Sequence, residues 1–105
     1  MATARIQSGI CGFQTTVNAR MDGSDVVLEI HSDCDAIQKL AAELTRVDPF
    51  QEISFRGAGP QTLNAARRYC RHPACPVPSG ILKAAEVAAG LALPADVVIH
   101  VTKEE

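Results

Sequence analysis

The sequence contains no tryptophan and few aromatic residues, which make up only 4% of its 105 positions. A hydrophobic core must therefore be built mainly from Val, Ile, Leu and Ala. A strong charge of either sign is also missing. The formal net charge of -2 at pH 7 gives no general attraction to nucleic acid or to an anionic membrane surface, so we expect neither partner.

Long hydrophobic runs are absent as well. The apolar stretches are short and broken by charged residues or proline, so we expect no segment to span a bilayer. The first residues, Met1 to Arg5, lack the apolar stretch of a secretory signal. With 47% apolar and 21% charged residues, the composition is that of a globular protein, and we expect one cytoplasmic domain, residues 1–105.

Alternating apolar and polar residues predict an antiparallel hairpin with a turn at Met21 to Gly23. The expected inward positions are Phe13, Thr15, Val17 and Ala19 in the first strand and Val26, Leu28 and Ile30 in the second. Residues 4–8 are expected to extend the sheet. Val97, Ile99 and Val101 alternate with other residues after Pro94 and predict a last strand.

Helical spacing of apolar residues predicts three helices. The first runs from about Ile37 to Val47 and is ended by Pro49. The second covers residues 61–71 after Pro60, with Leu63, Ala66 and Cys70 along one stripe, and the third covers residues 79–89 before Gly90. The fold class that follows is α+β: an antiparallel sheet of three or more strands with about three helices packed on one side.

Four cysteines are the main chemical feature of the chain, and each lies near the predicted boundary of an element. Cys11 lies in a glycine-flanked turn and Cys34 at the start of the first helix. Cys70 lies in the last turn of the second helix, and Cys75 lies in the proline-rich approach to the third. In a reducing compartment such thiols are used for coordination more readily than for disulfides. We therefore predict one metal site with Cys11, Cys34, Cys70 and Cys75 as ligands. The alternative is that some are small buried side chains.

Residues around these cysteines suggest further roles. His72 lies between Cys70 and Cys75 and is an alternative ligand. Arg67, Arg68 and Arg71 flank Cys70, and they are candidates to donate hydrogen bonds to cysteine sulfur or, alternatively, form a solvated helix face. Four thiolates suit zinc or an iron-sulfur cluster, and the sequence does not separate the two.

Catalytic patterns are weak by comparison. No Ser-His-Asp set and no pair of carboxylates suited to acid-base chemistry is recognisable, and residues 57–60 are interpreted as a turn, not an anion-binding loop. A site closed by four thiolates favours a structural or carrier role over an enzyme. Two alternatives stay open: a metal-free thiol redox protein using Cys70 and Cys75, and a domain that binds a protein partner without chemistry of its own.

The order of these motifs resembles a known family. Ser8-Gly9-Ile10-Cys11, Ser32-Asp33-Cys34 before a helix, Cys70, and the segment Cys75-Pro76-Val77-Pro78-Ser79-Gly80-Ile81-Leu82-Lys83-Ala84 are similar to the TSCPD domain. Pro73, Ala74 and Val77 depart from its name motif, as in a divergent branch. A fainter resemblance reaches the IscU/NifU-type iron-sulfur scaffold through Cys11, Cys34 and Cys75. Both resemblances imply a small α+β domain that holds a metal or cluster through cysteines.

Overall fold

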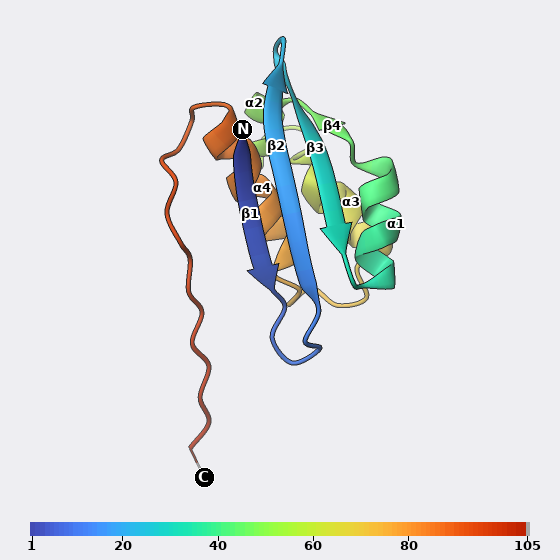
Figure 1. The fold of residues 1–105 in the computed structure, drawn as a ribbon. Coiled ribbons are helices and arrows are strands. Elements are labelled where there is room, and N and C mark those ends of the chain that lie inside the picture. Colours follow the sequence, from blue (N-terminus) through green and yellow to red (C-terminus); the bar gives the residue numbers. More distant parts are fainter. Residues whose placement is uncertain (105) are drawn as a thin grey trace.

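In a computed structural model describing residues 1–104, helices cover one face of a four-stranded antiparallel sheet (Figure 1). The strands are β1 (Ala2–Gln7), β2 (Gln14–Asp22), β3 (Asp25–Ser32) and β4 (Arg46–Val47), adjacent in that order. The helices are α1 (Asp35–Glu43), α2 (Pro49–Glu52), α3 (Gln61–Tyr69) and α4 (Val77–Ala88). The predicted α+β fold class is confirmed. Within residues 1–104, no helix has both the length and the apolar character needed to cross a membrane.

The central hairpin is the one expected from the alternating pattern. Val17 lies opposite Ile30 and Ala19 opposite Leu28, and Gly23 turns the chain with a φ of 64°. Strand β1 pairs with the other side of β2, with Ala4 opposite Val17. The alternation therefore places one set of side chains beneath the helices and the other on the open face of the sheet.

The core lies between the sheet and helices α1 and α4. Its fully buried members include Val17 and Val26 from the strands, Ile37 and Leu40 from α1, and Val77 and Ile81 from α4. Phe13, expected to point inward, is instead 39% exposed because it precedes the first residue of β2 and belongs to the connecting loop.

The first predicted helix is too long. Helix α1 ends at Glu43, and the next residues return to the sheet, where the Leu28 amide donates to the Thr45 carbonyl at 2.9 Å and Val47 pairs with Val26. Edge pairing with β3 thus prevails over the helical pattern. Pro49 does not end a helix; it begins α2, with the Asp48 side chain accepting a hydrogen bond from the Phe50 amide.

The second predicted helix is also too long at its C-terminal end: α3 ends at Tyr69, whereas the prediction extends to residue 71. Its buried face is centred on Thr62 and Ala65, one position away from the predicted stripe through Leu63. The third predicted helix corresponds to α4, and Gly90 follows it with a φ of 74°.

The predicted last strand is wrong as a feature of this chain in isolation. Residues 97–101 are exposed and belong to no strand. Their alternating pattern has a strand's composition, but a strand requires a partner, and none of the strands in residues 1–104 pairs with them.

Candidate functional site

Three of the four cysteines are held at one end of the domain by three different elements. Cys34 follows β3 and precedes α1, Cys70 ends α3, and Cys75 lies just before α4. In Figure 1 the end of β3 and the segment joining α3 to α4 lie at this same lower end. The three side chains are partly buried against the core, so the fold fixes their positions.

Cys34 occupies the position before the first turn of α1 without using its side chain as a cap. Its amide donates to the Ser32 hydroxyl at 3.1 Å, and its carbonyl accepts from the Gln38 amide at 2.9 Å. The backbone is thus satisfied by other groups, and the thiol is available at a helix N-terminus.

Cys70 lies where α3 ends, and its amide still donates to the Ala66 carbonyl at 2.8 Å. The backbone then turns extended, with a ψ of 135°. Burial, followed by the nearby negative charge of Cys75 and of Cys34, raises the pKa of the Cys70 thiol to about 11. The Cys70 thiol is therefore near two others, which lie 36 and 5 positions away in the sequence.

Cys11 is placed differently from the other three. It lies in the loop between β1 and β2, and it is exposed. The Ser8 amide donates to the Phe13 carbonyl at 3.1 Å, and Gly9 and Gly12 have φ values of 87° and 71°, which only glycine adopts readily. Figure 1 shows this loop at the same end of the domain as the end of β3 and the segment joining α3 to α4.

The described residues do not form a finished metal centre. In residues 1–104, no group of three or more His, Cys, Asp and Glu side chains is arranged to hold a metal ion. The three partly buried thiols are near enough to act on one another electrostatically, but they are not placed as ligands around a common point. The fold therefore brings the predicted ligands to one end without completing their coordination geometry.

The polar residues predicted around the cysteines have other neighbours or face solvent. Arg68 donates to the Glu43 carboxylate at 2.6 Å, and its guanidinium lies 5.9 Å from the centre of the Tyr69 ring. Arg67 and Arg71 are exposed, and so is His72. The contact of Arg68 with Glu43 raises the pKa of its guanidinium and directs it toward α1.

Sequence reasoning missed one buried polar site at Glu52. Its carboxylate is only 3% exposed and accepts hydrogen bonds from the Gln61 amide at 2.7 Å, the Thr62 amide at 3.0 Å and the Thr62 hydroxyl. It therefore caps the N-terminus of α3 and occupies the position that an anion would take after residues 57–60. An acid nine residues before a helix start gives no local signal, since capping signals are read within about three residues.

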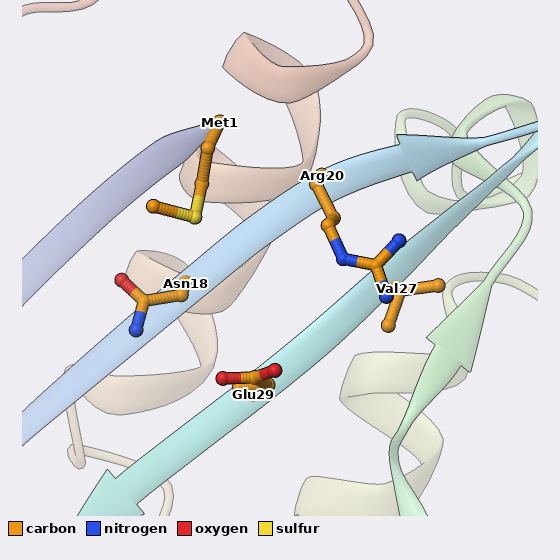
Figure 2. A pocket seen from close by; sticks show the side chains of 5 residues that line it. All are labelled: Met1, Asn18, Arg20, Val27 and Glu29. Carbon is orange, nitrogen blue, oxygen red and sulfur yellow. The ribbon is translucent and has the colours of Figure 1, made fainter.

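Two cavities of the domain are lined by residues other than the cysteines. A cavity of about 20 Å³ lies on the open face of the sheet (Figure 2), where Asn18, Arg20 and Glu29 surround it. That volume holds at most about one water molecule. A more open polar depression of about 280 Å³ lies between α1 and α3 and is lined by Arg46 and Arg68, both of which already face carboxylates.

Comparison with known proteins places the chain in one family. Residues 2–101 match the family of unknown function DUF6951, and the chain belongs to this family. No curated protein and no solved structure matches it. The resemblances to the TSCPD domain and to the IscU/NifU-type scaffold therefore stay predictions.

Proposed function

We propose that the protein binds zinc or an iron-sulfur cluster through Cys34, Cys70 and Cys75, with Cys11 as the fourth ligand. The observation that carries the proposal is the position of the Cys70 thiol, whose pKa is raised first by burial and then by the neighbouring thiols of Cys75 and Cys34. These three thiols come from the ends of three separate elements, so a packed core, and not a local loop, brings them together.

The donor set determines the class of metal. Thiolates are soft ligands that select zinc and iron-sulfur clusters over magnesium or calcium. With four thiolates no position is left for substrate, which fits a structural or carrier role in the cytoplasm.

Completion of the site requires the loop that carries Cys11 to close over the other thiols. The loop begins from the same end of the sheet, and Gly9 and Gly12 provide backbone freedom on both sides of Cys11. A bound metal would stabilise the closed loop, because metal binding contributes directly to folding free energy. Loop closure supplies the coordination that the present arrangement of residues 1–104 does not have.

The protonation of the Cys70 thiol makes metal binding dependent on pH. A thiol with a pKa of about 11 is protonated at neutral pH, and a metal must displace that proton to bind the thiolate. Affinity should therefore weaken as the pH falls. Arg67, Arg71 and His72 are exposed nearby along the chain and are candidates to approach the bound thiolates.

A second candidate is a dithiol redox pair of Cys70 and Cys75, since the two thiols are neighbours. The attacking form in thiol-disulfide exchange is the thiolate, and the raised pKa of Cys70 keeps its thiolate scarce at neutral pH. Metal binding needs the thiolate too, but the metal ion itself displaces the proton and holds the thiolate, so the raised pKa opposes metal binding less than thiol attack. A protein partner is compatible with either function.

The test is metal content in protein purified without oxygen and with a thiol reductant. Elemental analysis and an absorption spectrum separate colourless zinc protein from a coloured iron-sulfur protein. Cys34→Ser, Cys70→Ser and Cys75→Ser should each lose most of the metal, and Cys11→Ser should bind more weakly. His72→Gln is the control for the alternative ligand and should retain metal.

Two results would contradict the proposal. Metal content in Cys34→Ser and Cys75→Ser equal to that of the parent would reject their assignment as ligands. Metal-free parent protein that takes up neither zinc nor iron and sulfide, but forms a Cys70–Cys75 disulfide with oxidised glutathione, would establish the redox alternative.

A further inference from the structure

The C-terminal tail, residues 91–104, exposes a run of β-branched side chains. The exposed fractions are 58% for Val97, 82% for Val98, 74% for Ile99 and 84% for Val101. In Figure 1 the tail leaves α4, descends on the open-edge side of β1 and continues past the end of that strand. The molecule is accordingly 51 Å long but only 27 and 26 Å across. An exposed group of large apolar side chains of this kind is typical of an interaction surface.

The edge of the sheet formed by β1 is open and could pair with such a segment. Within residues 1–104, β1 pairs with β2 on one side and with no strand on the other. Its inward residues Ala4 and Ile6 are only partly buried, whereas Val17 and Ala19 on β2 are completely buried. Helix α4 packs beneath β1, where Gly80 lies against Ile6, but the side of β1 away from β2 has no neighbouring strand in residues 1–104. The backbone groups of that edge are therefore available for pairing.

We propose that residues 96–102 add as a strand to the β1 edge of a second copy of this chain, and that the exchange is reciprocal. An antiparallel register with Ile99 opposite Ala4 places Val97 opposite Ile6 and Val101 opposite Ala2. All three tail residues then face the helices, and the small alanines of β1 leave room for the larger side chains. A shift by one residue would instead bring Val98, His100 and Thr102 inward.

The dimensions and the symmetry favour a second copy. Seven extended residues span about 23 Å and the six residues of β1 about 20 Å at ~3.3 Å per residue, so the tail covers the edge. In its own chain the tail runs in the same direction as β1 and on past the end of that strand (Figure 1), so the antiparallel register fits the β1 edge of a second copy; Pro94 lacks an amide hydrogen for pairing before Asp96. In a two-fold dimer each copy gives one tail and receives one, so both open edges are covered.

The test compares two substitutions in neighbouring tail residues. Ile99→Asp places a charge on the face directed to the partner's core, and His100→Asp places the same charge on the solvent face. Neither residue lies in the folded core of its own domain, so both variants should keep their secondary structure. Light scattering after size exclusion should give twice the monomer mass of 11.2 kDa for the parent and for His100→Asp, and the monomer mass for Ile99→Asp.

Hydrogen exchange of the tail amides gives an independent measurement. In the dimer, the amides of residues 96–102 should be protected in the parent and lose most of that protection in Ile99→Asp. A monomeric parent would overturn the proposal. Protected tail amides in that monomer would indicate that the tail docks on the β1 edge of its own chain. Unprotected tail amides would indicate that the tail binds a different protein. A dimer unaffected by Ile99→Asp would overturn it as well.

Discussion

Removal of the Glu52 carboxylate should strongly destabilise the domain. In Glu52→Ala, the amide and hydroxyl of Thr62 lose their acceptor while Thr62 itself remains completely buried. A buried donor without a partner costs about 1–3 kcal/mol, so two of them set an expected loss of about 4 kcal/mol in the free energy of unfolding. The whole domain is expected to have only about 5–15 kcal/mol.

Graded variants separate the parts of this effect. Thr62→Val removes only the hydroxyl and should cost about 1 kcal/mol. Glu52→Gln keeps one acceptor oxygen but loses the charge beside the helix N-terminus, and it should lie between the two, at about 2 kcal/mol. The surface control is Glu43→Ala, which breaks a solvent-exposed pair with Arg68 and should have the smallest effect of the four variants.

Urea denaturation followed by circular dichroism measures all four variants. A loss for Glu52→Ala no larger than that for Glu43→Ala would refute the reasoning, because it would mean that water or another group replaces the buried carboxylate at no cost. A loss near that of Thr62→Val would show that only one of the three hydrogen bonds contributes to stability.

Three further outcomes are expected. Gly80→Ala should lower the free energy of unfolding by about 1 kcal/mol, although alanine has the better helix propensity. The reason is that the new Cβ would lie 2.3 Å from Cδ1 of Ile6. Adding Ile6→Ala should relieve this clash, and urea denaturation of the double variant checks it. Iodoacetamide at pH 8 should modify the exposed Cys11 well before Cys70, whose pKa is about 11, and mass spectrometry of timed digests gives the order. In metal-free protein, the contribution of Cys70 to the free energy of unfolding should be complete below pH 9 and decline toward pH 11. The reason is that the unfolded thiol loses its proton at the ordinary pKa of 9.0, whereas the folded thiol keeps it up to a pKa of about 11. A difference in unfolding free energy between the parent and Cys70→Ser that stays the same across this range would contradict the assignment.

Much of the fold was predictable because its signals are local. The alternation of Val17 and Ala19 with polar neighbours, and of Val26 and Leu28 with theirs, specifies a hairpin through a period of two and a glycine turn. The helix α4 could be located in the same way, from its apolar spacing and the glycine at its end. The candidate cysteines could be named from sequence, but which of them meet could not.

Long-range contacts decided the rest. Val47 had the spacing of a helical residue, and only its pairing with Val26 makes it part of a strand. Glu52 reaches the start of α3 because the chain between them turns back, which no local pattern records. The segment 97–101 has the composition of a strand, but within residues 1–104 it pairs with no other strand, which composition alone does not reveal.

The sequence by itself determined the α+β class, the hairpin and the positions of the thiols relative to element ends, because these depend on side-chain periodicity and backbone preferences over a few residues. Only the tertiary structure decided that Cys34, Cys70 and Cys75 share one end of the core while Cys11 remains exposed on its loop. The physical reason is that residues distant in the chain become neighbours through packing of the whole core, and the free energy of that packing belongs to no single segment.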